Sequence, residues 1–346
     1  MRQRMNVLSL TVMLLMMFGL TGSVALGQDY QIKKTVELVV PFNTGGTYDA
    51  YCRLIQPYFE KYLEKVSGQD LTVIVTNKAG GSGRIAYTDI YRDKNPNSPR
   101  LTLMASPTAI LFNIADKKST FKVDEFNFIG NINNDVHYLL VRDDLTDITT
   151  FSDLTAAAQK QPLLFGTSGI GASEMQHGMF LTALLKDHGL DLNFDYVNYN
   201  GTGEVKAGFL SKDIELTMGN TINAKSYVES KAARPIAVVA RKRTAEFPEV
   251  PTLIELGCPE EVVASIEDVL KLSYRFVASP NMDPTLLAYC RQALADSLAD
   301  PELLKEAAGR TLPINFVDWE TDYKNAQAAV KTFEAYADLV NQIYND

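Results

Sequence analysis

Three glycine-rich loops are the segments of this sequence whose residues could do chemistry. They cover residues 42–49, 80–84 and 166–173, and each combines glycines with Ser or Thr side chains. Each loop lies between a predicted strand and a predicted helix, so free N–H groups and the helix dipole favour an anion there. Hydroxyl groups add hydrogen-bond donors, and glycine lets the backbone approach a ligand closely. The pattern predicts an anion-binding site, while tight turns with helix caps remain the alternative for any single loop.

The motifs that mark common enzymes and metal sites are missing from the sequence. Residues 166–170 read GTSGI, which is not the GxSxG nucleophile motif, and 80–84 fits neither a P-loop nor GxGxxG. The three histidines, His137, His177 and His188, are scattered and offer no obvious base for a nucleophile. We expect each to have a structural or surface role. Because CxxC, HxxxH and HExxH are also absent, we expect no enzymatic activity, no cofactor and no bound metal.

Strands and helices alternate around the first two loops. Short apolar runs predict strands at 35–40, 71–75 and 101–104. Helical periodicity separates them at 51–66, where Pro57 should introduce a kink, and around 85–91. This order predicts a parallel sheet, and ligands bind at the carboxyl edge of such sheets.

The rest of the chain repeats this alternation and predicts an α/β fold throughout. A helix is expected over 151–159, and another follows the third loop. Further strands are predicted at 138–141, 163–165, 214–218, 236–239 and 271–278. A last helix over 319–344 has apolar residues three and four positions apart, so we expect it to pack on a core.

The N-terminal 27 residues have the pattern of a secretory signal peptide. Arg2 and Arg4 precede an apolar run over 7–20, and small residues follow at Ser23, Ala25 and Gly27. The run is short for a membrane span, so an uncleaved anchor is the less favoured alternative. Cleavage would leave 319 of the 346 residues and, by removing two arginines, change the formal charge from −9 to −11. We therefore expect a soluble, exported protein.

The charge of the chain argues against one class of partner, and its cysteine content limits the number of disulfides. The 42 acidic residues outnumber 33 basic ones, which argues against nucleic acid as a partner because phosphate contacts need a clustered basic surface. Cys52, Cys258 and Cys290 allow at most one disulfide, and the sequence leaves open whether any two of them pair.

Five segments resemble the substrate-binding receptors of tripartite tricarboxylate transporters, also called Bug receptors. PFNTGG-TYDAYCR at 41–53 resembles the family's PFxPGGxxDxxAR opening, and RKRTAEFPEVPTLIELG at 241–257 is similar to its KRxxxxPxVPTxxExG segment. VTNKAGGSG at 75–83, FGTSGIGAS at 165–173 and YNGTGEVKAGFLSKDIEL at 199–216 also resemble family segments, in the family's order. The resemblance covers about residues 35–340.

The resemblance implies a two-lobed, periplasmic-binding-protein fold of type II-like topology. Each lobe would be a mainly parallel sheet flanked by helices, with two chain crossovers near 131–138 and 265–273. The first lobe would then comprise residues 28–134 and 270–346, and the second lobe residues 135–269.

The family's cleft residues can be carried over onto matching positions of this chain. Backbone amides and hydroxyls would hold the carboxylate oxygens, partly through bridging water. The residues expected to line the cleft are Phe42, Asn43, Thr44, Gly45, Gly46, Thr47, Asp49, Gly81, Gly83, Arg84, Ser106 and Thr108 on the first lobe, and Thr167, Ser168, Gly171, Ala172, Ser173, Tyr199 and Asn220 on the second.

Several positions depart from the family pattern or stay open. Thr44 replaces a usual Pro, and Ala172 replaces a common Thr. Arg84 replaces Asn and either pairs with a distal carboxylate of the ligand or points to solvent. Gly219 stands where many members have Asp, which removes a partner for an ammonium group and disfavours an amino-acid ligand. Asp49 matches the pattern but either contacts ligand or caps its own loop.

Taken together, the resemblance implies a monomeric periplasmic receptor. It would bind a small organic mono- or dicarboxylate between its lobes, close by a hinge, and deliver the ligand to membrane permease subunits. A module that presents the ligand to a membrane signalling protein is one alternative. A secreted hydrolase is the less favoured one, because no nucleophile–base pair is evident from the sequence.

Overall fold

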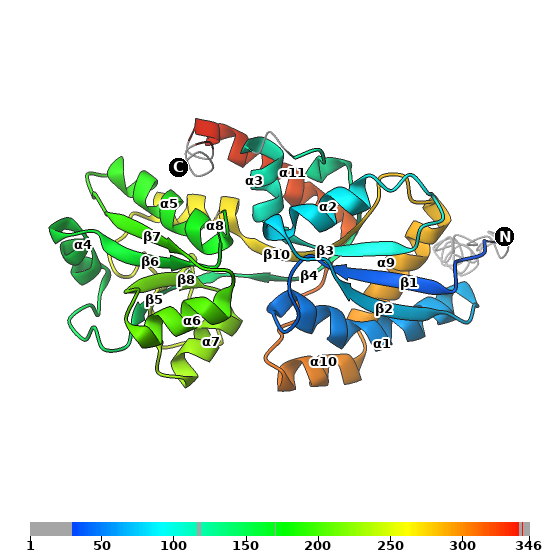
Figure 1. Cartoon of the computed structure of the whole chain (residues 1–346), viewed down its shortest axis with the longest axis horizontal. Coiled ribbons are helices and arrows are strands. Elements are labelled where there is room, and N and C mark those ends of the chain that lie inside the picture. Colours follow the sequence, from blue (N-terminus) through cyan, green and yellow to red (C-terminus); the bar gives the residue numbers. More distant parts are fainter. Residues whose placement is uncertain (1–29, 116–118, 170, 339–340, 342–346) are drawn as a thin grey trace, which may run out of the picture.

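The computed structural model describes residues 30–115, 119–169, 171–338 and 341, so the signal peptide expected over 1–27 lies outside the described residues. Two α/β lobes lie side by side and are joined in the middle by extended strands (Figure 1). Within the described part of the chain, no helix is both long and apolar enough to cross a membrane.

The first lobe is built on a six-stranded sheet with the strand order β11-β4-β10-β3-β1-β2. In this sheet β1 pairs in parallel with β2 and β3, whereas β10 is antiparallel to β3 and β4, and β11 is antiparallel to β4. The strands are β1 (Thr35–Val40), β2 (Thr72–Asn77), β3 (Arg100–Ser106), β4 (Asn127–Asp135), β10 (Leu272–Ala278) and β11 (Val317–Asp318).

The second lobe contains a five-stranded sheet with the order β7-β6-β8-β5-β9. Here β6 pairs in parallel with β7 and β8, and β5 is antiparallel to β8 and β9. The strands are β5 (His137–Arg142), β6 (Leu163–Thr167), β7 (Phe194–Asn198), β8 (Leu216–Gly219) and β9 (Ala233–Val239).

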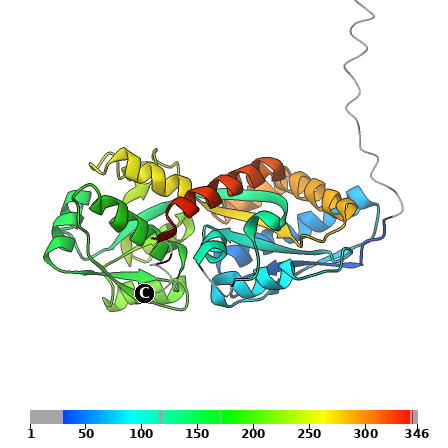
Figure 2. The ribbon, with the colours of Figure 1, turned by 90° about the horizontal axis from the view of Figure 1, so that it is seen from above.

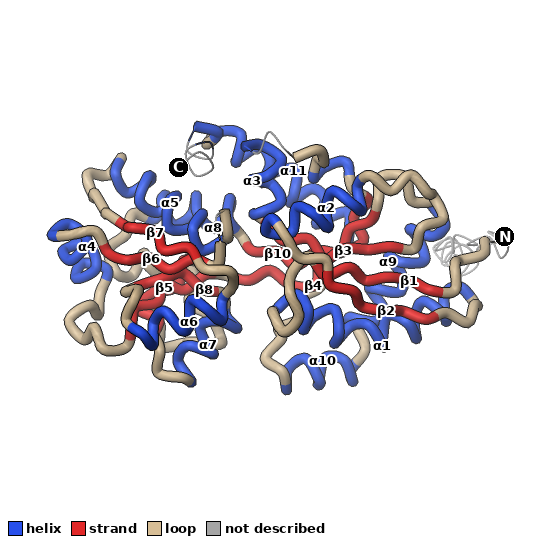
Figure 3. The backbone as a smooth tube through the Cα atoms, in the orientation of Figure 1, coloured by secondary structure: helices blue, strands red, loops and turns tan. Residues whose placement is uncertain are grey.

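The α/β class and the two-lobed fold predicted from the sequence are confirmed, but the expectation of mainly parallel sheets is wrong because both sheets are mixed. The antiparallel pairs involve the segments that pass between the lobes. The chain leaves the first sheet through β4, enters the second sheet as β5 after Val136 alone, and returns from α8 (Glu260–Leu270) to β10 (Figure 3). A strand that returns from another lobe can run in either direction relative to its neighbour, and β10 runs antiparallel to β3.

Two helix layers cover the first sheet, and one of them reaches the second lobe. Apolar side chains of α1, α9 and α10 form one cluster, and those of α2, α3 and α11 belong to another that continues into the second lobe. The rings of Phe333 on α11 and Phe180 on α5 have centroids 5.9 Å apart, and Figure 2 shows α11 extending from the first lobe towards the second. The expected packing of the last helix on a core is confirmed.

Local signals in the sequence account for several helix ends. Helix α1 ends at Gly68, whose φ of 70° is a left-handed conformation that favours glycine. Helix α4 begins with a capping box between Thr150 and Asp153. The helices are α1 (Thr47–Ser67), α2 (Arg84–Tyr91), α3 (Thr108–Ala115), α4 (Phe151–Lys160), α5 (Ser173–Lys186), α6 (Thr202–Ser211), α7 (Thr221–Glu229), α9 (Pro284–Leu298), α10 (Pro301–Gly309) and α11 (Trp319–Ala335), with 3₁₀ turns η2 (Gly81–Gly83) and η3 (Val123–Glu125).

Candidate functional site

The predicted loops all follow the carboxyl ends of parallel-paired strands. In the first lobe they follow β1, β2 and β3, and in the second they follow β6, β7 and β8. Loops from the two lobes approach each other, because a Cβ atom on Gly169 would lie 3.9 Å from Oγ of Ser82. Nε2 of Gln176 on α5 lies 3.4 Å from Oγ1 of Thr108 on α3. These loops therefore form a boundary between the lobes that is lined with hydroxyl groups and helix N-termini.

Asp49 holds the first loop in place. Its carboxylate accepts hydrogen bonds from the backbone N–H of Gly45 at 2.9 Å, from Nε of Arg53 at 3.0 Å and from Nδ2 of Asn77 at 3.0 Å. Burial alone would raise the pKa of Asp49, but these donors outweigh burial and leave the pKa below its ordinary value. The side chain is fully engaged in fixing its own loop, which is one of the two roles that the sequence left open.

The remaining residues of the first loop differ in their surroundings. Asn43, Thr44 and Gly45 are exposed, whereas Gly46 and Thr47, at the start of α1, are half-buried. The ring of Phe42 packs against Tyr48 with centroids 4.6 Å apart, and Tyr48 in turn packs against Tyr274 of β10 at 5.0 Å. This aromatic row supports the loop from the side of the crossing strands.

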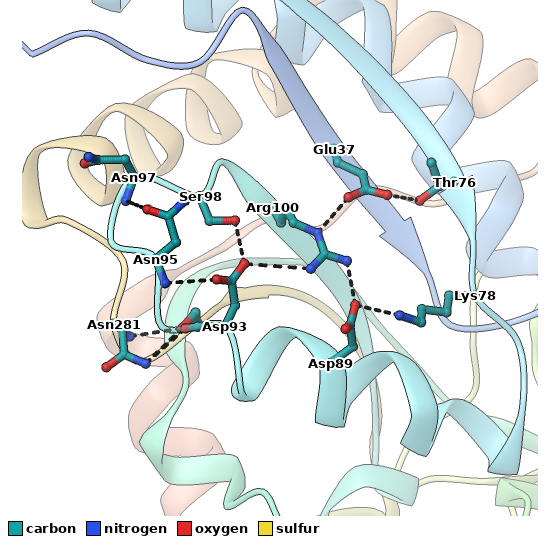
Figure 4. A network of polar contacts seen from close by, with 11 residues as sticks. Glu37, Thr76, Lys78, Asp89, Asp93, Asn95, Asn97, Ser98, Arg100 and Asn281 are labelled. Carbon is teal, nitrogen blue, oxygen red and sulfur yellow. Dashed lines mark hydrogen bonds and ion pairs between the residues drawn. The ribbon is translucent and has the colours of Figure 1, made fainter.

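The second glycine loop is positioned by Tyr87 and by an ionic network. A Cβ atom on Gly83, where φ is 96°, would lie 2.5 Å from the hydroxyl oxygen of Tyr87, so only glycine fits there. Arg100 of β3 links Glu37 of β1 at 2.7 Å to Asp89 of α2 at 2.6 Å (Figure 4).

Lys78, which follows β2, also pairs with Asp89, at 2.7 Å. This network fixes α2 against the sheet and thereby positions the loop residues Gly81 and Gly83. Arg84, the first residue of α2, is half-buried, and its contact with ligand stays a prediction.

Ser106 and Thr108 lie where β3 ends and α3 begins. They flank Pro107, and the Ser106–Pro107 peptide bond is cis. Both side chains are buried, and Thr108 begins α3. Because Oγ1 of Thr108 is close to Nε2 of Gln176, this hydroxyl is in direct contact with the second lobe.

On the second lobe, the predicted hydroxyl residues surround Glu174, which the sequence analysis missed. Oγ of Ser168 donates to Oε1 and Oε2 of Glu174 at 3.0 and 3.1 Å, and Oγ of Ser173 is 3.5 Å from Oε2. Only 6% of Glu174 is exposed, and burial raises the pKa of its carboxyl group against the effect of these donors. Glu174 directly follows the predicted glycine loop, and this position is the one feature of the sequence that could have identified it as a site residue.

The other residues of this loop shape the start of α5. Oγ1 of Thr167 is 2.7 Å from Oδ1 of Asn198 on the neighbouring β7. Ala172 is the N-cap residue of α5, and the carbonyl oxygen of Gly171 accepts a hydrogen bond from Nε2 of Gln176 at 2.8 Å. These contacts fix the loop at the N-terminus of α5, where Ser173 is the first helical residue.

Tyr199 and Asn220 are used for packing within and between the lobes. The Tyr199 ring lies against α6, where a Cβ atom on Gly208 would be 2.4 Å from its hydroxyl oxygen. Oδ1 of Asn220 caps α7 through the N–H of Asn223, and its Nδ2 donates to the hydroxyl of Tyr274 at 2.9 Å. The Tyr199 hydroxyl therefore lies against α6, but the Tyr199 backbone lies beside the third glycine loop. Its N–H donates to the carbonyl oxygen of Thr167 at 2.9 Å, and its carbonyl oxygen would be 3.9 Å from a Cβ atom on Gly169.

His137 and His177 form a buried pair, although their positions in the sequence suggested that they were scattered. Their ring centroids are 3.8 Å apart, and Nδ1 of His177 donates to the carbonyl oxygen of Ser173 at 2.8 Å. Burial lowers the pKa of His177 to about 4 and that of His137 well below its ordinary value, so both rings are neutral at neutral pH. Forty residues separate them, and only the packing of α5 on β5 reveals the pair.

The same cluster contains one serine–histidine contact. Nε2 of His137 lies 3.2 Å from Oγ of Ser173, a serine–histidine pair that was not evident from the sequence. However, Nδ1 of His137 has no hydrogen-bond partner in the described part of the chain, whereas a catalytic base needs a third group to orient it. The lowered pKa of the ring also makes it a weak base, so the pair does not support hydrolysis.

The structure also bears on cysteine pairing and on metal binding. Cys52, Cys258 and Cys290 are all free and buried, so none of them pairs. In the ranges that the structure describes, no group of three or more His, Cys, Asp or Glu side chains is arranged to hold a metal ion. The site presents hydroxyl groups and helix N-termini, which suit the binding of an anion.

Known proteins share this sequence pattern and fold. BugT from Bordetella pertussis is 23% identical over 281 residues, which is 80% of this chain and 80% of that protein. A Rhodopseudomonas palustris protein solved with adipate has a TM-score of 0.72 and 21% identity, and covers 88% of this chain and 97% of that chain. MatC from the same organism, with bound malate, has a TM-score of 0.71 and 19% identity, covering 88% and 98%. The model of the "Tripartite tricarboxylate transporter family receptor" matches residues 59–333. This chain therefore belongs to the tripartite tricarboxylate transporter receptor family.

Proposed function

We propose that the protein is a periplasmic receptor that captures a small organic carboxylate between its lobes and delivers it to the permease subunits of a tripartite transporter. The observation that carries this proposal is the meeting of two sets of strand-end loops, seen in the 3.4 Å contact between Thr108 and Gln176. Hydroxyls and helix N-termini from both sets converge there, and such donors suit a carboxylate. The adipate and malate in the two Rhodopseudomonas palustris structures support the same ligand class.

We assign residues 28–134 and 270–346 to the first lobe and 135–269 to the second. The passages between the sheets, at Val136 and at Lys271, lie close to these bounds and support the division. Bending at these two single-residue links would open and close the lobes with little change inside either sheet. Cleavage after the signal peptide expected over residues 1–27 would release the protein into the periplasm.

A thermal-shift screen tests ligand binding by the purified protein. The panel contains adipate, malate, citrate, benzoate and glutamate, with adipamide as an uncharged analogue of adipate. A ligand at 100 times its Kd stabilises the folded state by roughly 2.7 kcal/mol, which is a shift of several degrees in Tm. We expect at least one carboxylate to raise the Tm and adipamide to leave it unchanged.

Variants of the lobe boundary locate that binding. Thr108→Val removes one buried hydroxyl at the boundary, and Thr146→Val removes an exposed hydroxyl between β5 and α4 as a matched control. We expect the carboxylate-dependent shift to fall in Thr108→Val and to persist in Thr146→Val. If no carboxylate raises the Tm of the wild-type protein, the proposed function is wrong.

Uptake separates transport from signalling, since both roles would use the same ligand site. Uptake of the labelled carboxylate is compared in a strain with and without the gene for this protein. Loss of uptake in the deletion strain supports transport, whereas unchanged uptake contradicts it.

A further inference from the structure

A pocket with a volume of about 120 Å³ lies at the passage between the lobes, apart from the carboxylate site. It is lined by the end of β4, by Thr221 at the start of α7, by Thr244 and Glu246 after β9, and by Asn315 before β11. The predicted glycine loops follow β1, β2 and β6. The pocket borders β4, β9 and β11, which stand towards the opposite ends of the two strand orders. None of the residues that line it is among the predicted cleft residues, although Thr221 directly follows Asn220, the N-cap residue of α7.

Asp135, one of the residues that line this pocket, has an unsatisfied carboxylate oxygen. Only 5% of Asp135 is exposed. Its Oδ1 accepts hydrogen bonds from Oγ1 of Thr221 at 2.6 Å and from the N–H of Val136 at 2.9 Å. Its Oδ2 is buried and has no hydrogen-bond partner in the described part of the chain. An unpaired buried carboxylate oxygen is costly, so this position calls for a cation or a proton.

The side chains that line the pocket offer oxygen atoms and negative charge. Glu246 is exposed at the pocket and lies close enough for its charge to act on Asp135. Thr244 and Asn315 add a hydroxyl and an amide oxygen, and none of the lining residues is Lys, Arg or His. Burial raises the pKa of Asp135 to about 6, which is the expected response of a carboxylate without a cationic partner.

We propose that this pocket binds one Ca²⁺ ion, with Asp135 and Glu246 as charged ligands and the oxygens of Thr244 and Asn315 as neutral ligands. Ca²⁺ accepts six to eight oxygen ligands in flexible geometry, whereas Mg²⁺ requires a near-ideal octahedron. The lack of His and Cys in the lining disfavours zinc. Two carboxylates form a weakly charged site, so we expect a Kd of about 10⁻⁴–10⁻³ M, as in extracellular calcium modules.

Such an ion would join the two lobes. Asn315 belongs to the segment that enters the first sheet, whereas Thr244 and Glu246 follow β9 of the second sheet, and Asp135 ends the strand that leads from one to the other. Bound Ca²⁺ would therefore restrain the position of the lobes relative to each other. This consequence is independent of the proposed carboxylate site.

Isothermal titration calorimetry of the purified, EDTA-treated protein with CaCl₂, in the absence of any carboxylate, tests the proposal. We expect one site with a Kd of about 10⁻⁴–10⁻³ M and at least tenfold weaker binding of MgCl₂. Glu246→Gln should weaken Ca²⁺ binding at least tenfold without affecting folding, because this side chain is exposed. Glu249→Gln, an exposed carboxyl in the same loop, is the matched control and should leave the Kd unchanged.

Asp135→Asn keeps an acceptor for Thr221 but removes the charge, and we expect it to abolish Ca²⁺ binding. Terbium luminescence gives a second readout, because the hydroxyl of Tyr138 is 2.7 Å from Oγ1 of Thr244 and its ring can sensitise a bound lanthanide. Absence of Ca²⁺ binding by the wild-type protein overturns the proposal. Equal binding by wild type, Glu246→Gln and Asp135→Asn also overturns it. Neither result bears on carboxylate binding, which is measured separately.

Discussion

Gln176 of α5 and Thr108 of α3 connect the two lobes directly, with 3.4 Å between Nε2 of Gln176 and Oγ1 of Thr108. Both side chains are buried, and Gln176 also donates to the carbonyl oxygen of Gly171 in the third glycine loop. One side chain therefore holds the third loop and touches the opposite lobe. A residue in this position links the conformation of a binding loop to the closure of the lobes.

Replacing Gln176 should weaken carboxylate binding. Gln176→Ala removes both hydrogen bonds, each of which contributes about 1 kcal/mol, so the Kd of a bound carboxylate should rise about 5- to 30-fold. Gln292→Ala on α9 changes an exposed glutamine of the first lobe and serves as the control. Titration calorimetry with both variants measures the effect. An unchanged Kd in Gln176→Ala would show that the interlobe contact has no part in binding.

Asp49→Asn should loosen the first glycine loop. The variant keeps the shape of the side chain but loses the charge that attracts Arg53, with Nη2 of Arg53 2.9 Å from Oδ1 of Asp49. Urea unfolding should show a loss of about 1–2 kcal/mol, since Asp49 is buried and charge-assisted hydrogen bonds are lost. The free energy of unfolding should fall at pH 7. Equal stability of variant and wild type would contradict the role assigned to Asp49.

The buried histidines predict a decrease in stability as the pH falls. The folded-state pKa of His177 is about 4, below the ordinary value of 6.5, so between these values the unfolded state takes up a proton that the folded state does not. Stability should therefore drop between pH 6.5 and 4, by up to about 3 kcal/mol from this group. Asp135, with its pKa raised to about 6, acts in the opposite direction between pH 4 and 6.

Comparison of wild type with His177→Gln isolates the contribution of this histidine, because the effect of Asp135 is common to both proteins. Between pH 7 and pH 5, the free energy of unfolding should fall less in the variant than in the wild-type protein. A pH dependence that is identical in the two proteins would mean that His177 is not held neutral by the fold.

Arg84→Ala tests the distal end of the ligand site. A bidentate pair between Arg84 and a second carboxylate would make the variant bind a dicarboxylate at least tenfold more weakly, with little change for a monocarboxylate of equal length. Titrations with adipate and hexanoate make this comparison. Equal losses for both ligands, or none for either, would contradict the distal role of Arg84.

The sequence was sufficient to predict the loops but not their partners. The loops after β1, β2 and β6 could be located because glycine, Ser and Thr between an apolar run and a helical pattern are local signals. The pairing of His137 with His177, and the contact of Thr108 with Gln176, involve residues 40 and 68 positions apart. Contacts of this kind depend on the packing of whole elements, which periodicity does not determine.

Strand direction was also beyond the sequence pattern. Alternating strands and helices favour parallel pairing, and β1 with β2 follows that rule. β10 looks like the other strands in its residues, yet it enters the first sheet antiparallel to β3 because it returns from the second lobe. The burial of the acids Glu174 and Asp135 was also not predictable, since their charge suggests exposure until the surrounding elements are in place.

The most direct test of the receptor assignment is calorimetric titration of the wild-type protein with the carboxylate that gives the largest thermal shift, in parallel with Thr108→Val. The account predicts saturable binding of one carboxylate per chain, at least fivefold weaker binding to Thr108→Val, and no binding of the corresponding amide. Absence of carboxylate binding, or equal binding of the amide, would contradict the account.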